Sequence, residues 1–298
     1  MNLTINTDIT EPVQAEIDRL SSMGGGCIDV PPGTYHFRTL RMESGVHIRL
    51  SAGCRMIASG KRKDYPFTGY NHNEMGDVYS AIYALRKSDI TLSGEGTLDL
   101  NARAFYNKDK WADVETSGPP VTTEYTDEAP RSYEWRVNQP VFFHECTNVR
   151  LSGLTIVDAP CWTVSLSCCE TVRVRDLTIR NNVTVPNSDG IHCTSSRDIT
   201  ISGCHISAGD DCVALSGITD WDRPTEDVVI QNCVFLSASK AISVGYMHSI
   251  VRNVLISDVI VRRSNRAFAV MCNPGTGLVE HLYVNNCIFE GRSYGGNW

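Results

Sequence analysis

Short stretches in which apolar and polar residues alternate recur along most of this 298-residue chain. Six nine-residue segments share one pattern. Each begins with a polar residue, continues with alternating apolar and polar positions, and ends with a polar pair followed by an apolar stretch. The segments are 148–156, 171–179, 198–206, 227–235, 253–261 and 281–289. Earlier versions of the pattern occur at 46–56 and 90–98. A period of two residues is typical of β-strands, so each segment predicts strand structure.

The spacing of these segments indicates how the strands are connected. Intervals of 23, 27, 29, 26 and 28 residues separate their first apolar residues, which are Val149, Val172, Ile199, Val228, Val254 and Leu282. The seventh position is always apolar or cysteine, as expected for an interior stack: Leu154, Leu177, Cys204, Cys233, Val259 and Cys287. These features favour an all-β solenoid, a parallel β-helix, over a β-sandwich, because hairpin turns such as Asn-Gly are scarce.

A short helix is expected ahead of the solenoid, over residues 10–24. Thr10 is expected as its N-cap, and Pro12 lies in the first turn, where proline is tolerated. Apolar residues then follow at helical spacing, namely Val13, Ile17 and Leu20. Such a helix would cover the first coil, because an open sheet edge at the end of a solenoid must be protected.

Two further regions depart from the repeat. Residues 101–139 have no steady period and predict a long loop insertion, whose Trp111 and Trp135 are expected either to stack on sugars or to pack on the solenoid. After Phe289 the sequence shows no cap. We therefore predict one β-helix domain over residues 1–298 whose C-terminal cap is missing, either because the chain is truncated or because self-association covers the last coil.

Charge and composition narrow the classes of partner. The formal net charge of −7 argues against nucleic acid, which calls for a basic face. No apolar run approaches the roughly 20 residues that span a membrane, and the N-terminus lacks a signal-peptide pattern, so a cytoplasmic location is expected unless a leader was removed. The twelve cysteines include no CxxC pair, so we expect buried small hydrophobes, and neither metal nor cofactor.

The candidate chemistry lies in two acidic motifs, Asn187-Ser188-Asp189-Gly190 and Gly209-Asp210-Asp211-Cys212. Carboxylates set close together serve general acid/base catalysis, although Asp-Gly pairs also mark turns and acidic clusters also form calcium loops. The two neighbouring aspartates of the second motif would point to opposite faces of a regular strand. The glycine before them is expected to permit the bend that turns both into one site.

The solenoid is expected to bring these carboxylates together. Asp189 and Asp210 are 21 residues apart, close to one coil, and Lys240 and Arg266 follow after a further 30 and 26 residues. Residues at matching positions of successive coils are neighbours, so the four side chains would form one ladder on the outer face. Two acidic coils followed by two basic coils indicate a cleft that binds and cuts a substrate.

At these motifs the chain resembles the polygalacturonase-like glycoside hydrolases of family 28. Asn187-Ser188-Asp189 and Gly209-Asp210-Asp211 are similar to the family's Asn-Thr-Asp and Gly-Asp-Asp, and the likeness extends to residues 30–35, 94–99 and 158–162. The resemblance implies a right-handed parallel β-helix and inverting hydrolysis of a pectin-type oligo- or polysaccharide. It implies Asp210 as the general acid, and Asp189 and Asp211 as the groups that position and deprotonate water.

Two departures from the family pattern bear on the substrate. The family's Gly-His-Gly is Ser239-Lys240-Ala241 here, and its Arg-Ile-Lys is Arg266-Ala267-Phe268. Lys240 is expected to replace the positive charge beside the general acid. Arg266 would hold a uronate carboxylate, whereas Phe268 would offer a stacking surface in place of a cation. One fewer cation predicts a substrate other than homogalacturonan, such as a rhamnose-containing or partly neutral oligosaccharide.

Two residues and two alternative functions complete the sequence-based picture. Asn187 and His192 are further candidates for substrate contact. The role of His192 stays open, because the sequence does not show whether its side chain lies on the same face of the strand as Asp189.

A polysaccharide lyase would use Lys240 or Arg266 as proton acceptor and would need calcium. A non-catalytic glycan-binding solenoid would fit a site that has decayed at Lys240 and Phe268, and it would bind sugar without cleaving any bond.

Overall fold

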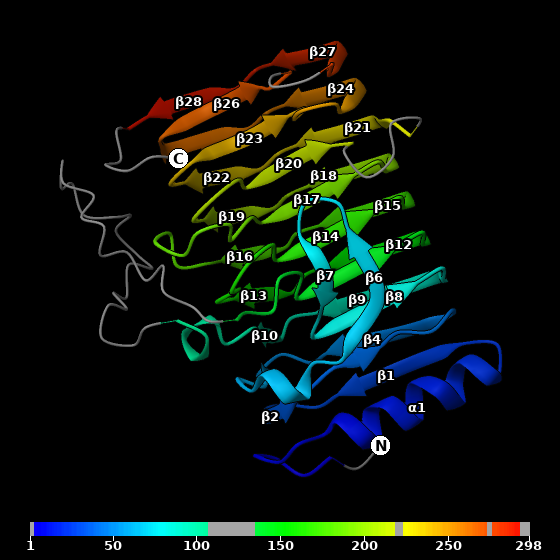
Figure 1. The fold of residues 1–298 in the computed structure, drawn as a ribbon. Coiled ribbons are helices and arrows are strands. Elements are labelled where there is room, and N and C mark those ends of the chain that lie inside the picture. The colour runs from blue at the N-terminus through cyan, green and yellow to red at the C-terminus, as the bar shows by residue number, and fades with distance from the viewer. Residues whose placement is uncertain (1–2, 107–134, 218–222, 273–275, 293–298) are drawn as a thin grey trace.

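The computed structural model describes residues 3–106, 135–217, 223–272 and 276–292. Three parallel sheets run along one axis, and the chain passes from one sheet to the next within each coil (Figure 1). Sheet I is formed by β1 (Gly26–Val30), β4 (Val46–Leu50), β9 (Ser88–Gly94), β12 (Thr147–Ser152), β15 (Glu170–Arg175), β18 (Arg197–Ser202), β21 (Thr225–Gln231), β24 (Ile250–Ser257) and β27 (Leu278–Asn285).

The other two parallel sheets complete each coil. Sheet II is formed by β2 (Gly33–Phe37), β5 (Cys54–Ala58), β10 (Thr97–Asp99), β13 (Thr155–Val157), β16 (Thr178–Arg180), β19 (His205–Ala208), β22 (Val234–Ser237), β25 (Ile260–Ser264) and β28 (Ile288–Gly291). Sheet III is formed by β3 (Leu40–Arg41), β8 (Ile82–Leu85), β11 (Val141–His144), β14 (Val164–Ser167), β17 (Ile191–Thr194), β20 (Val213–Ser216), β23 (Lys240–Val244) and β26 (Arg266–Val270). The predicted fold class, an all-β right-handed parallel β-helix, is confirmed.

The register of sheet I follows the alignment of the sequence repeat. Val149 pairs with Val172, and the same position continues through Ile199, Val228, Val254 and Leu282 on successive coils. Each nine-residue segment supplies one strand of sheet I and one of sheet II. The seventh position lies between those strands and is buried from Leu154 to Val259. The interior stack predicted from the sequence is therefore confirmed.

The polar residue that begins each repeat has a backbone role. All six have a left-handed backbone, with φ between 53° and 58°: Asn148, Thr171, Asp198, Asp227, Asn253 and His281. Asparagine and aspartate tolerate this conformation better than most other residues, because their short side chains bond locally. Several of these side chains also bond along the stack, as Asn253 Nδ2 does to Asp227 Oδ1 at 2.9 Å.

The predicted helix is present as α1 (Thr10–Ser22), which covers the first coil (Figure 1). Its apolar residues Val13, Ile17 and Leu20 are buried against the core, as predicted. The prediction of Thr10 as N-cap is wrong. Ile9 occupies that position, and the Thr10 amide donates to the Asp8 carboxylate, while the Thr10 hydroxyl accepts a bond from the amide of Arg38.

A hairpin leaves the solenoid between β5 and β8. It consists of the antiparallel strands β6 (Phe67–His72) and β7 (Gly76–Tyr79), preceded by the 3-10 turn η1 (Arg62–Asp64). The ring of Tyr70 lies 3.9 Å from that of His144 on β11, so the hairpin packs on the outer face of sheet III. The predicted loop at 101–139 begins with η2 (Ala102–Ala104), and residues 107–134 of that prediction, including Trp111, lie outside the described residues.

The last coil has an apolar surface. Tyr283 is 65% exposed and Ile288 is 64% exposed, and Leu278 and Phe289 are also exposed.

All twelve cysteines are free, and eight of them are buried. This agrees with their interpretation as small hydrophobic residues. Among the described residues, no helix has the length and apolar character needed to cross a membrane.

Candidate active site

The acidic motifs lie at the entrances to two neighbouring strands of sheet III, immediately before β17 and β20. Ile191 pairs with Val213, and Val213 pairs with Ile242. Counting back two residues on each strand places Asp189, Asp211 and Lys240 at one register position. The predicted ladder therefore exists, but Asp211 rather than Asp210 occupies its second step.

The backbone around the two motifs is shaped by an asparagine and a glycine. Asn187 has a left-handed backbone, with φ of 54°. Gly209 is required for close approach, because a Cβ there would lie 2.1 Å from the carbonyl oxygen of Val185. Its φ is not positive, so Gly209 permits tight packing between two loops and does not supply a left-handed bend. Its amide also donates to Ser188 Oγ at 3.0 Å, which ties the two motifs together.

A cavity of about 190 Å³ collects the predicted charged residues on the outer face of sheet III. Four carboxylates and one ammonium group line it, from Glu74, Asp189, Asp210, Asp211 and Lys240. The other lining residues are Trp162, Asn187, His192, Ala214, Leu215, Ser216, Ser243, Gly245, Tyr246 and Met271. The three aspartates therefore share one small polar cavity, as their proposed common chemistry requires.

Lys240 neutralises part of this negative charge. Its Nζ lies 3.1 Å from Asp211 Oδ1 and 3.8 Å from Asp210 Oδ1. Burial acts to lower the pKa of Lys240, but the charges of Asp211 and Asp210 outweigh it and leave this pKa raised. The raised pKa favours the charged form of the lysine beside both aspartates of the second motif, where the sequence predicted a positive charge.

A buried arginine holds Asn187 beside Asp210. Arg136 Nη2 donates to Asn187 Oδ1 at 2.8 Å, and Asn187 Nδ2 donates to Asp210 Oδ2 at 3.4 Å. The same guanidinium donates to the hydroxyl of Tyr106 at 2.6 Å and to the carbonyl of Pro186 at 2.7 Å. Asn187 therefore orients Asp210, in addition to lining the cavity.

His192 lies between Asp189 and a serine of the next coil. Its Nδ1 is 2.9 Å from Asp189 Oδ2, and its Nε2 is 3.1 Å from Ser216 Oγ. The imidazole stacks on Trp162, with ring centroids 3.6 Å apart and an interplanar angle of 18°. Burial lowers the pKa of His192 to about 4, so the ring is neutral near pH 7. Both nitrogens are engaged within the protein, which points to a positioning role for this histidine.

Burial favours the protonated form of two of the aspartates. Desolvation, followed by the charge of Asp210, raises the pKa of Asp189 well above its ordinary value. Desolvation and the charges of Asp210 and Asp189 do the same for Asp211. Burial and mutual repulsion therefore favour the protonated forms of Asp189 and Asp211 more strongly than for an exposed aspartate. Asp189 Oδ1 is buried and accepts no hydrogen bond from a described residue, which leaves it able to accept one from a water or a sugar hydroxyl.

The last two predicted substrate residues lie on β26, beyond the cavity. Arg266 is exposed and pairs in register with Lys240, but it does not line the cavity. Phe268 pairs in register with Ile242 and packs against the hydrophobic core. The predicted stacking surface at Phe268 is therefore wrong, because strand alternation turns this side chain into the solenoid.

Four residues of the site were missed in the sequence: Glu74, Arg136, Trp162 and Ser216. Trp162 lies in a segment that carries the family resemblance, so its motif was a usable signal. Glu74 lies between the two strands of the hairpin, and Arg136 lies in the irregular insertion. Neither position follows the repeat, so no periodic signal pointed to them.

Comparison with known proteins agrees with this architecture. A "probable polygalacturonase" of Vitis vinifera is 24% identical over 94% of this chain, and rhamnogalacturonase B of Aspergillus niger is 23% identical over 97%. The chain spans 57% and 44% of the lengths of these two relatives. An exopolygalacturonase structure from Thermotoga maritima has a TM-score of 0.76 and 21% identity, covering 95% of this chain and 72% of that one. The model of the glycosyl hydrolases family 28 matches residues 76–295, so the chain belongs to that family.

Proposed function

We propose that the protein hydrolyses a glycosidic bond in a pectic oligo- or polysaccharide with inversion at the anomeric carbon. The observation that carries this proposal is the convergence of three aspartates and Lys240 in one cavity of about 190 Å³. Membership of the glycosyl hydrolases family 28 supports the reaction class. Inverting hydrolysis needs one carboxyl group that donates a proton and another carboxylate that activates water.

The proposed roles divide the three aspartates between these tasks. Asp210 protonates the leaving oxygen, and Asn187 with Lys240 holds it in place. Asp189 and Asp211 bind the attacking water and take its proton. For Asp189 this is supported by its buried, unbonded Oδ1 and by the histidine that fixes its other oxygen. These roles require Asp210 to carry a proton, and Asp189 or Asp211 to be ionised, when the bond breaks.

The substrate that we propose contains neutral sugar, such as rhamnose, next to the bond that is cleaved. Among the Asp, Glu, Lys and Arg residues that line the cavity, four are acidic and one is Lys240. This balance disfavours a uronate carboxylate in the cavity, because the cation there, Lys240, is already paired with Asp211 and Asp210. The presence of a rhamnogalacturonase among the relatives agrees with this choice.

An NMR time course on a panel of pectic oligosaccharides tests the reaction and the substrate together. Wild type is expected to release the inverted anomer from rhamnose-containing oligomers faster than from galacturonate oligomers, and Asp210→Asn to release none. A faster reaction on galacturonate oligomers would contradict the proposed substrate. An unsaturated product that disappears with a chelator would identify a lyase, and binding without turnover in both proteins would identify a glycan-binding module.

We also propose that the chain self-associates through its last coil. Leu278, Tyr283, Ile288 and Phe289 form an exposed apolar surface on β27 and β28. Exposed apolar surface of this kind favours contact with another apolar surface. Sedimentation over a range of concentrations is expected to show a dimer that Tyr283→Lys with Ile288→Lys dissociates. A monomer at every concentration would contradict self-association.

A further inference from the structure

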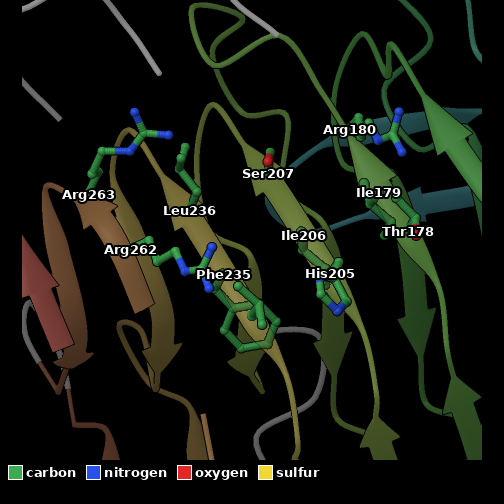
Figure 2. Close-up of a pocket in the computed structure, with 11 residues that line it drawn as sticks. Thr178, Ile179, Arg180, His205, Ile206, Ser207, Phe235, Leu236, Arg262 and Arg263 are labelled. Carbon is green, nitrogen blue, oxygen red and sulfur yellow. The ribbon is translucent and has the colours of Figure 1, made fainter. Parts of the chain in front are cut away.

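A groove of about 320 Å³ crosses sheet II, on a different face of the solenoid from the candidate active site. It spans four adjacent coils through β16, β19, β22 and β25 (Figure 2). None of its lining residues lines the catalytic cavity. The two sites nevertheless share coils, since Ser207 in the groove lies three residues before Asp210 and Leu236 lies four residues before Lys240.

The groove is cationic within a chain whose formal net charge is −7. Arg180, His205, Arg262 and Arg263 line it, and no acidic residue does. Figure 2 shows Ser207 and Leu236 lying between Arg180 on one side and Arg262 and Arg263 on the other. The positive charges therefore stand at both sides of a shallow floor.

Strand geometry sets the spacing of these charges. Arg180 pairs with Ser207, and Ser207 pairs with Leu236, so three outward side chains stand in one row. Arg262 follows Val261, whose partner on β22 is Phe235, and thereby extends the row to a fourth coil. Three steps between strands separate the two arginines by about 14 Å along the axis. The site is suited to an extended ligand with anionic groups several sugar rings apart.

Arginines on sheet I are commonly paired with acids of a neighbouring coil. On sheet I, Arg173 pairs with Asp198, Arg197 with Glu170 and Arg252 with Glu226. Within the described part of the chain, Arg180 and Arg262 form no ion pair. Uncompensated guanidinium groups suit the binding of a carboxylate ligand, because the planar fork of arginine matches a carboxylate in two parallel bonds.

We propose that this groove is a second, non-catalytic binding site for the uronate units of a pectic chain. Arg180 and Arg262 bind uronate carboxylates, the hydroxyls of Thr178 and Ser207 bond sugar hydroxyls, and Leu236 lies under a ring face. The choice of ligand rests on the proposed function, because a pectic polymer supplies carboxylates away from the bond that is cleaved. The groove thereby holds the anionic stretches of a polymer that the acidic cavity disfavours.

Calorimetry on the Asp210→Asn protein tests the groove without turnover. The probe is a purified galacturonate oligomer long enough to span four coils. Relative to the parent, R180Q/R262Q is expected to lose one binding site, or to weaken that site at least tenfold, equivalent to about 1.4 kcal/mol. The matched control is R150Q/R175Q, which removes the same charge from exposed positions on sheet I and is expected to keep every site.

Several results would overturn this proposal. They are an unchanged number and affinity of sites in R180Q/R262Q, equal losses in the control, or equal binding of the methyl-esterified oligomer at this site. Equal binding of a sulfated polysaccharide there would identify a general anion site instead of a uronate site. Hydrolysis of pectic oligomers by wild type is measured separately. A chain that hydrolyses them but has no arginine-dependent site therefore contradicts the groove alone.

Discussion

A single imidazole fixes the orientation of one candidate catalytic carboxylate. A neutral histidine has one donor and one acceptor nitrogen. With the proton on Nδ1, His192 donates to Asp189 and accepts from Ser216, and the stacked Trp162 restricts rotation of the ring. These contacts favour a role for His192 in positioning Asp189. The sequence had indicated substrate contact for this histidine instead.

Replacing Ser216 tests whether the hydrogen bonds from Ser216 through His192 to Asp189 fix the orientation of that carboxylate. Ser216→Ala removes the partner of Nε2, so the ring can turn or change tautomer and Asp189 loses its fixed orientation. We expect kcat to fall about tenfold, or about 1.4 kcal/mol in barrier height, with little change in KM. Ser216→Thr keeps a hydroxyl and should restore most of the rate. An unchanged kcat in Ser216→Ala, or equal losses in both variants, would show that the serine does not contribute to this orientation.

Lys240 sets the pH at which the candidate base is ionised. Its charge acts to lower the pKa of both Asp189 and Asp211. In Lys240→Met that effect is lost, so both pKa values rise further and the base is protonated up to a higher pH. We expect the acidic limb of the kcat/KM profile to move upward by about one pH unit or more. Lys240→Arg keeps the charge and serves as control; an unmoved acidic limb in Lys240→Met would exclude this role.

At the scale of elements, the hairpin of β6 and β7 adds a fourth carboxylate to the cavity. Glu74 lies between the two strands and lines the cavity, and burial raises its pKa. The ionised form of Glu74 opposes the entry of a uronate. Glu74→Gln is therefore expected to lower KM for galacturonate oligomers by about threefold to tenfold, with a smaller effect on neutral oligomers.

The same hairpin supplies the control for this substitution. Asp77→Asn makes an equal change of charge on β7, but Asp77 does not line the cavity. We expect its KM values to stay near those of wild type. Equal changes in KM for galacturonate and neutral oligomers in Glu74→Gln would mean that the hairpin affects access to the cavity and does not select by charge.

The repeat was predictable because two of the three strands in each coil have one polar face. Sheet I strands such as β12 alternate between buried and exposed residues, so their period is visible in the sequence. Strands of sheet III such as β14 and β20 are buried on both faces, because the hairpin and the cavity residues cover their outer side. These strands do not alternate, and sheet III was inferred only through the charged residues at its strand entrances.

Only those residues of the site that belong to the repeating coils could be predicted from the sequence. Asp189 and Lys240 fall at matching positions of different coils, which the spacing of the motifs could indicate. The error of one residue between Asp210 and Asp211 arose because the coils differ in length and no sequence signal shows where β20 begins. Arg136 reaches Asn187 across 51 residues of chain, and such a contact follows from folded geometry alone.

At the scale of the whole molecule, charge is separated between two faces of one solenoid. The cavity on sheet III is acidic around Lys240, whereas the groove on sheet II is basic. The same coils carry both, so one polymer can meet both without any change in the fold. A groove that attracts carboxylates and a cavity that disfavours them would together place a less charged linkage at the aspartates.

The buried carboxylates also make the stability of the whole fold depend on pH. Because the folded pKa of Asp189 is raised above its unfolded value near 3.9, the native state holds a proton that the unfolded chain releases between those two values. Stability therefore falls as pH rises from about 4 towards the raised pKa. Asp189→Asn removes this penalty, and we expect Tm at pH 7 to rise by about 2–4 °C while activity is lost.

Measuring Tm at two pH values, for Asp189 and for a control aspartate, separates the cost of a buried charge from a general effect of removing a carboxylate. At pH 4 the unfolded chain has lost only about half of this proton, so the gain in Tm from Asp189→Asn should be much smaller than at pH 7. Asp258→Asn removes an exposed carboxylate and is expected to leave Tm unchanged at both pH values. A gain of equal size at pH 4 and pH 7 would mean that packing or hydrogen bonding, and not a buried charge, sets the stability at this site. The expected pattern would instead show that the carboxylate proposed as a base is kept at a cost to the fold, as is common where catalysis needs a buried charge.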